Sequence, residues 1–259
     1  MTLSGVSSLD EPVDYRLDGA VASITLNRPS RLNAISHELA VDLVAALDLA
    51  ARDQARVVLL TGIGKAFCAG HDLKIDGGHQ DGTAGYADRL QDVTRRIRSM
   101  PAIVIAAVHG YVLGGGFEFA LTSDLVIAAQ DAVFGFPEVG VGLSVTGGVT
   151  KLLTYYVGPL RAKQLLITGE RLTADQAKTL GLVNWVVERD ELMSRAASLA
   201  EVLLGQPSLS MTLAKQAVDA GLDNSLESQL EMETYHLSMA EQSPEAALGR
   251  AAFRLLHPS

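Results

Sequence analysis

The sequence predicts an α/β fold, and three observations support this class. First, short apolar runs rich in β-branched residues, at 57–60, 103–108 and 125–129, have the length of strands that are buried on both faces. Second, segments with helical spacing of apolar residues separate these runs. Third, nearly all signals after residue 147 are helical. Buried strands that alternate with helices are typical of α/β architecture.

The N-terminal part predicts two strands and a helix. Apolar side chains alternate over residues 13–17, Asp18 and Gly19 form a hairpin-type turn, and residues 21–26 form the second strand. Ser36 is placed to cap the helix that follows, in which leucines recur every four residues. We therefore expect the fold to open with a hairpin that leads into an amphipathic helix.

A strand, a glycine turn and a helix start are predicted at the centre of the chain. The strand at 103–108 leads into Gly114, Gly115 and Gly116, and Glu118 falls in the first helical turn. Glycines let backbone N–H groups approach a ligand, and a helix N-terminus attracts negative charge. The stretch thus offers a carboxylate beside a possible oxyanion site, although tight turns and helix starts also use these residues for structural reasons alone.

Spacing excludes two kinds of nucleotide-binding loop. A dinucleotide fingerprint that begins at Gly114 would need its third glycine at Phe119, and one that begins at Gly62 would need it at Phe67. The segment 62–66 also lacks the serine or threonine of a phosphate-binding loop.

Composition excludes several classes of protein. The chain has 259 residues, of which 48% are hydrophobic, and this is enough for one large domain with a helical appendage. Its formal net charge of -9 argues against a nucleic-acid or anionic-membrane surface. The single cysteine, Cys68, excludes an internal disulfide and a thiolate metal cage. No signal peptide and no membrane-spanning run is apparent. We expect a cytoplasmic protein without a metal, nucleic-acid or membrane partner.

The second half of the chain predicts a helical region after the last strand. Thr173 and Gln176 form a capping-box pattern, Gly181 marks the end of that helix, and residues 182–187 are the last strand candidate. Amphipathic helices follow at 190–204, 207–221, 225–242 and 244–256.

These signals suggest two regions and one irregular loop. We expect a core at 1–190 that holds the active site and a helical region at 191–259. Residues 76–85 are rich in glycine and polar side chains, which predicts a mobile surface loop before a helix at 86–100.

Three ordered segments resemble the signature blocks of the crotonase (enoyl-CoA hydratase/isomerase) superfamily. They are GKAFCAGHDLK at 64–74, VHGYVLGGGFE at 108–118 and FGFPE at 134–138. The similarity runs from Asn27 to Asn184 and therefore covers most of the chain. Three blocks in order are far more specific than one glycine cluster.

The resemblance implies both a fold and an oxyanion hole. The fold would be a crotonase-like spiral of strand-strand-helix units with a helical C-terminal region that forms a homotrimer or a dimer of trimers. The oxyanion hole would be the backbone N–H groups of His71 and Gly115. A single donor of this kind can stabilise a developing oxyanion by about 3 kcal/mol.

The resemblance also implies a reaction. Family members that are hydratases carry glutamates at the positions of Glu118 and Glu138, and both are present here. The implied activity is that of an enoyl-CoA hydratase, which adds water reversibly to a trans-2-enoyl-CoA and gives a 3-hydroxyacyl-CoA. Glu118 would be the base that activates water and Glu138 the acid at the α carbon. Two close carboxylates repel, which raises the pKa of one of them.

Coenzyme A would enter as part of the acyl-CoA substrate, with no permanently bound cofactor. The residues that match the coenzyme groove of the family are Arg28, Leu32, Ala34, Lys65, Ala66, Ala69 and Lys74. Lys74 is a candidate partner for a phosphate. Ordinary surface charge is the alternative explanation for the basic residues in this set.

The chain departs from the family pattern in two places. Residues 144–148 read SVTGG where the family usually has Pro-Gly-x-Gly-Gly, and the C-terminus lacks the usual Glu-Lys-Arg tail. Because the first segment borders the acyl site, we expect residues 143–146, together with 76–85, to set selectivity. Other acyl-CoA reactions of the family (isomerase, dehalogenase, hydrolase) and a non-catalytic binding protein of this fold remain alternatives. Isomerases typically need one carboxylate, so the second glutamate favours a hydratase.

Overall fold

The computed structural model describes residues 11–74 and 82–256. The chain divides into two compact units, residues 1–200 and 201–259. The boundary at 190/191 that the sequence suggests stays a prediction. Most of the predicted mobile loop lies outside the described residues.

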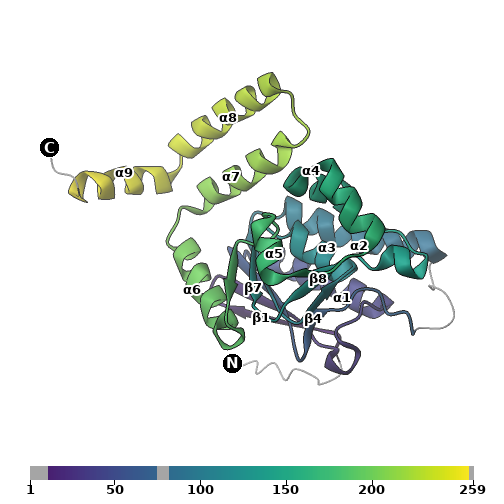
Figure 1. The fold of residues 1–259 in the computed structure, drawn as a ribbon. Helices are drawn as coiled ribbons and strands as arrows, with labels where there is room; N and C mark the ends of the chain where they lie inside the picture. Colours follow the sequence, from purple (N-terminus) through teal and green to yellow (C-terminus); the bar gives the residue numbers. More distant parts are fainter. Residues whose placement is uncertain (1–10, 75–81, 257–259) are drawn as a thin grey trace. The chain divides into compact units, whose positions relative to one another are not determined.

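The first unit contains a six-stranded sheet with the order β1-β2-β3-β5-β7-β10. Its strands β1 and β7 are labelled in Figure 1. Its strands are β1 (Val13–Asp18), β2 (Val21–Leu26), β3 (Val57–Gly62), β5 (Ile103–Val108), β7 (Leu125–Ala129) and β10 (Trp185–Val187). Neighbours are parallel except for the antiparallel hairpin of β1 and β2. Every residue of β3 and β5 is buried. Strands buried on both faces need continuous apolar sequence, and this is why the sequence predicted them.

A second sheet of four short strands has the order β4-β6-β8-β9. Its strands are β4 (Ala66–Cys68), β6 (Tyr111–Leu113), β8 (Val133–Gly135) and β9 (Leu172–Thr173). Strands of three residues or fewer show no apolar period, so β4, β6 and β9 are absent from the sequence-based prediction. This small sheet positions the candidate site.

The two sheets are connected by a repeated strand-strand-helix unit. In the units β3-β4-α2, β5-β6-α3 and β7-β8-α4, the first strand joins the large sheet and the second joins the small sheet. The predicted spiral of strand-strand-helix units is therefore confirmed. Because β4, β6 and β8 are parallel, their C-terminal ends lie at one edge of the small sheet, and the three segments that follow them meet there. Assembly into trimers stays a prediction.

The helices of the first unit follow the sequence signals closely. They are α1 (His37–Arg52), α2 (Gly82–Ser99), α3 (Gly115–Thr122), α4 (Val149–Thr168), α5 (Ala174–Thr179) and α6 (Leu192–Leu204), of which the last ends beyond the unit; short 3-10 turns lie at Pro29–Arg31, Glu138–Val141 and Arg189–Glu191. The predicted caps are present: Ser36 accepts from the Leu39 N–H, and Thr173 and Gln176 form a capping box. Gly158 interrupts α4 with a φ of 75°.

Helix α2 corrects one expectation. It begins at Gly82, so residues 82–85, which were predicted to belong to the loop, are helical. The glycine-rich sequence has low intrinsic helix propensity, but the same helix buries Leu90, Val93 and Ile97 against the core. Tertiary packing of one apolar face can override weak local propensity.

The second unit is helical. It contains α7 (Ser208–Gly221), α8 (Leu226–Glu241) and α9 (Pro244–Leu256), close to the predicted segments. The Glu245 carboxylate of α9 accepts hydrogen bonds from the backbone N–H groups of Ser208 and Leu209 at 3.1 and 3.2 Å, where α7 begins. It satisfies donors that a helix start leaves without intrahelical partners. Among the described residues of both units, none of the helices combines the length and the apolar character that crossing a membrane requires.

Candidate active site

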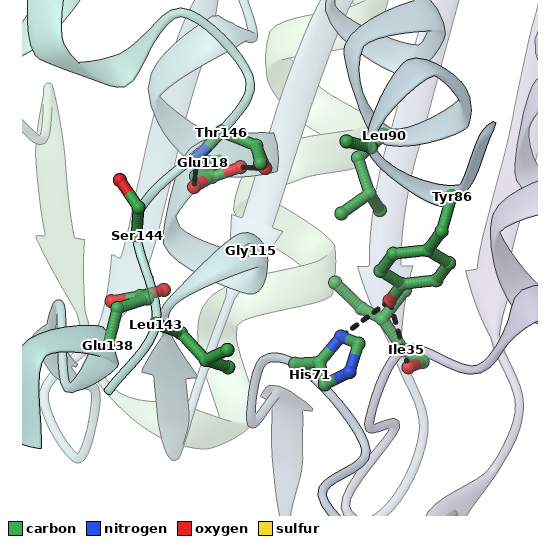
Figure 2. Close-up of a pocket in the computed structure, with 11 residues that line it drawn as sticks. Ile35, His71, Tyr86, Leu90, Gly115, Glu118, Glu138, Leu143, Ser144 and Thr146 are labelled. Carbon is green, nitrogen blue, oxygen red and sulfur yellow. Dashed lines mark hydrogen bonds between the residues drawn. The ribbon is translucent and has the colours of Figure 1, made fainter. Parts of the chain in front are cut away.

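A cavity of about 140 Å³ lies where the small-sheet strands end (Figure 2). Its lining residues are Ile35, His71, Tyr86, Ala87, Leu90, Gly115, Glu118, Glu138, Leu143, Ser144 and Thr146. All four residues predicted to be catalytic are in this set. In Figure 2 the glutamates lie on one side of the cavity and His71 with Tyr86 on the other, with Gly115 between them.

The glycine turn before α3 places the first backbone donor. Gly114 precedes the helix with φ 52° and ψ -127°, and its N–H donates to the Gly135 carbonyl at 2.9 Å. The N–H groups of Phe117 and Glu118 both donate to the Gly114 carbonyl. The amide of Gly115 belongs to the first helical residue, whose N–H has no acceptor within the helix. It is therefore placed to donate into the cavity that Gly115 lines.

His71 lies on a loop that pairs with the chain at Ile35. The Ile35 N–H donates to the Gly70 carbonyl at 2.8 Å, and the Asp72 N–H donates to the Ile35 carbonyl at 3.1 Å. In a parallel pair of this pattern, the residue between the two bonded groups directs its own N–H and C=O to the other side of the strand. The His71 backbone amide therefore points away from Ile35, on a residue that lines the cavity.

Tyr86 of α2 contacts the same loop through its hydroxyl. The hydroxyl lies 2.7 Å from His71 Nδ1 and donates to the Ile35 carbonyl at 3.3 Å. Because one hydroxyl proton is available, donation to Ile35 leaves the oxygen to accept from a protonated Nδ1. The predicted backbone role of His71 is thus accompanied by a side-chain contact that the sequence did not suggest.

Glu118 is almost completely enclosed. Its exposed fraction is 3%, and its two oxygens accept 2.7 Å hydrogen bonds from the backbone N–H and the hydroxyl of Thr146. Burial raises the pKa of Glu118 above its ordinary value, while the hydrogen bonds from Thr146 oppose the rise.

Glu138 has a different environment. It begins the 3-10 turn after β8, and its carboxylate lies against Gly114, since a Cβ added to that glycine would be 2.5 Å from Glu138 Oε1. Oε2 is buried without a hydrogen-bond partner among the described residues. Burial raises the pKa of Glu138 to about 7, and the nearby Glu118 carboxylate contributes to the rise. Glu138 is therefore suited to carry a proton near neutral pH.

We expect Glu138→Gln to stabilise the protein at about pH 8 but not at about pH 4. At the lower pH, Glu138 is mostly protonated in both the folded and the unfolded state, so its burial does not lower the free energy of unfolding. Between its ordinary pKa and the folded value of about 7, the unfolded state has lost the proton that the folded state keeps, so stability falls as pH rises. Above pH 7 the folded state carries the buried charge of Glu138, which lowers the free energy of unfolding. Glutamine has no such charge, so the variant is more stable there.

Urea unfolding of both proteins at the two pH values measures this difference. The exposed Glu188 provides a matched Glu→Gln control, which should show no such pH dependence. An equal effect of Glu138→Gln at both pH values would contradict the environment described for Glu138.

A second cavity, of about 400 Å³, adjoins the first at His71, which lines both. Its lining residues are Ser30, Arg31, Leu32, Ala34, Ala69, His71, Asp72, Leu73 and Lys74. Four of the residues predicted to bind the coenzyme, Leu32, Ala34, Ala69 and Lys74, are therefore brought together. The described residues contain no cluster of three or more His, Cys, Asp or Glu side chains that could hold a metal ion.

The other three predicted coenzyme residues do not line this cavity. Arg28 forms an ion pair with the buried Asp72 at 3.1 Å and donates to the Ala34 carbonyl, so it ties the two loops of the cavity together. Ala66 is fully buried in β4. Lys65 is outside the lining set. Their contact with a coenzyme stays a prediction.

Sequence reasoning missed the contacts that support the glutamates and the His71 loop. Thr146 is the main example: its segment was noted as a departure from the family pattern, but nothing in the sequence indicated that it would reach Glu118. Leu143, Ser144 and Thr146 all line the first cavity, as the selectivity hypothesis for 143–146 requires.

Comparisons with known proteins agree on one family. A sequence model of the enoyl-CoA hydratase/isomerase family matches residues 16–254. The short-chain-enoyl-CoA hydratase of Clostridium acetobutylicum is 37% identical over 226 residues, or 84% of each chain. The 1,2-epoxyphenylacetyl-CoA isomerase of Escherichia coli is 36% identical and covers 92% of this chain and 93% of its own. A crystal structure of an enoyl-CoA hydratase from Bacillus anthracis superposes with a TM-score of 0.89 at 32% identity, over 94% of this chain and 96% of that one.

Proposed function

Because the chain belongs to the enoyl-CoA hydratase/isomerase family, we propose that it is an enoyl-CoA hydratase, which adds water to a trans-2-enoyl-CoA and gives a 3-hydroxyacyl-CoA. One observation carries the proposal: the carboxylates of Glu118 and Glu138 line the same cavity as His71 and Gly115. A single-carboxylate reaction would not need the second of these groups. The relative named as an isomerase keeps isomerisation as the alternative.

In the proposed reaction, the thioester carbonyl oxygen accepts hydrogen bonds from the backbone amides of His71 and Gly115. Ionised Glu118 takes a proton from water as the oxygen of that water attacks the β carbon. The π electrons move onto the thioester oxygen, where the two amides stabilise the enolate. Protonated Glu138 then delivers its proton to the α carbon. Glu118 ends protonated and Glu138 ionised, so one proton must pass between them or through solvent before the next turnover.

The two cavities accommodate the two parts of an acyl-CoA. The acyl group would occupy the first cavity, between the glutamates and the apolar side chains of Ile35, Leu90 and Leu143. The coenzyme would extend through the second cavity, where Lys74 can meet a phosphate. His71 lies at the junction, which is where the thioester must sit if its backbone amide is to reach the carbonyl.

The direct test is incubation with crotonyl-CoA and with longer enoyl-CoAs. We expect loss of the absorbance of the conjugated thioester, with formation of the 3-hydroxyacyl-CoA checked by mass spectrometry. If the folded protein binds coenzyme A but consumes none of these substrates, the hydratase proposal is wrong. Appearance of a 3-enoyl-CoA in place of the hydroxy product would support the isomerase.

A further inference from the structure

The segment that departs from the family pattern lies directly on the Glu118 carboxylate. The Thr146 hydroxyl is 2.7 Å from Glu118 Oε2, and the Thr146 N–H is 2.7 Å from Oε1. The next residue, Gly147, has a φ of 57°, and a Cβ added to it would lie 2.8 Å from Oε2. The Thr94 hydroxyl of α2 donates to the Gly147 carbonyl at 3.0 Å and so holds this loop from the other side. The close approach leaves no room for a side chain at Gly147.

The direction of these bonds bears on where protons lie. The Thr146 N–H can only donate, and the hydroxyl must donate as well when Glu118 is ionised, because a carboxylate is only an acceptor. Donors to the charged form favour that form. Glu138 has less support of this kind: a hydrogen bond from its own backbone lowers its pKa, but its Oε2 lacks a partner among the described residues. The pair is therefore asymmetric, with two donors on one carboxylate.

The other groups near Glu118 supply no positive charge of their own among the described residues that face it. Cys68 and Tyr86 interact electrostatically with Glu118, and burial raises the pKa of both, so they are neutral near pH 7. Glu138 contributes only repulsion. His71 lies across the cavity, where its ring contacts Tyr86. Thr146 thus provides the two direct hydrogen bonds that favour a charge on Glu118.

We propose that the Thr146 hydroxyl is a positioning group that keeps Glu118 ionised and thereby places the proton of the carboxylate pair on Glu138. The backbone N–H of residue 146 is present whatever the side chain, whereas the hydroxyl is a property of threonine or serine at this position. The effect of this hydroxyl on catalysis rests on the proposed hydratase function. The position of the proton on Glu138 rather than Glu118 does not depend on that function, and it can be measured without turnover.

The test compares Thr146→Val with Thr146→Ser. Valine keeps the branched shape and removes the hydroxyl, and serine keeps the hydroxyl. In protein labelled with ¹³C at the glutamate carboxyl carbons, we expect valine to raise the lower titration step of the pair by about one pH unit, and serine to leave it unchanged. The Glu118→Gln protein identifies the resonance. Thr150→Val, an exposed threonine four residues along the chain, is the matched control and should have no effect.

If the protein hydrates crotonyl-CoA, the acidic limb of its kcat/KM profile should move to higher pH by the same amount in Thr146→Val. An unchanged carboxyl titration in Thr146→Val would overturn the inference even in an active hydratase. A shifted titration in a protein without hydratase activity would support the inference and refute the proposed function. If valine impairs folding, Thr146→Ala removes the same hydroxyl with less volume, and its titration decides between the two outcomes.

Discussion

We expect the Glu118→Gln protein to hydrate crotonyl-CoA about 10²–10⁴-fold more slowly than the unmodified protein, the range typical for loss of a general base. Glutamine keeps the shape of the side chain: its carbonyl can accept from the Thr146 N–H, and its amide can donate to the Thr146 hydroxyl. The group proposed to take a proton from water is lost, while the cavity is kept. The loss should therefore appear in kcat, with little change in the dissociation constant for a saturated acyl-CoA.

Stopped-flow absorbance for hydration and calorimetric titration for binding separate these two effects. Glu188→Gln, an exposed change of the same kind, should leave both unchanged. Undiminished hydration by the Glu118→Gln protein would remove Glu118 from the role of base. Weaker acyl-CoA binding with normal kcat would indicate that Glu118 contacts the substrate without transferring a proton.

We expect Gly114→Ala to remove hydratase activity and to destabilise the fold. The backbone at Gly114 has φ 52° and ψ -127°, which an alanine adopts only at a cost of about 1–2 kcal/mol or more. Its Cβ would also lie 2.5 Å from Glu138 Oε1, so the carboxylate must move. Relaxation of the turn would in turn shift the Gly115 amide. One methyl group would therefore disturb both the proposed acid, Glu138, and a proposed oxyanion donor, the Gly115 amide.

Urea unfolding and crotonyl-CoA hydration of Gly114→Ala should be compared with those of Gly140→Ala. Gly140 has nothing within 4 Å of an added Cβ and no positive φ, so the same substitution there should be nearly neutral. Normal stability and activity in Gly114→Ala would show that the turn is more adaptable than its geometry indicates. Loss of activity in Gly140→Ala would show that activity is sensitive to any change near the Glu138 turn.

The elements that the sequence predicted are those with a long or distinctive local signal. The buried strands β3 and β5 appear as continuous apolar runs, and the capping box at Thr173 is a pattern of two residues at fixed spacing. The short strands of the second sheet carry no such signal, because their pairing depends on partners distant in the sequence. The start of α2 was misplaced because packing of its apolar face, rather than local propensity, decides where it begins.

The candidate site was predicted through the family blocks, and its supporting contacts were not. Glu118 and Gly115 belong to one continuous block, but the approach of Thr146 to Glu118 spans 28 residues of sequence and depends on how the loop before α4 folds back. Arg28 was predicted to contact the coenzyme, because its segment matches a region that lines the coenzyme groove of the family. In the structure its guanidinium faces Asp72, a pairing that no local pattern indicates.

The strand-strand-helix repeat has a consequence for how this protein family can diversify. Successive units deliver the His71 loop, the α3 start and the Glu138 turn from neighbouring strands, and strands in one sheet are about 4.8 Å apart because main-chain hydrogen bonds fix their spacing. The backbone thus fixes where the groups proposed to transfer protons lie. Residues such as Leu90 and Leu143, which line the first cavity from a helix and a loop, can be exchanged without moving that framework. Under the proposed function, a few side-chain replacements in the cavity would change the substrate, while the groups proposed for the chemistry keep their positions.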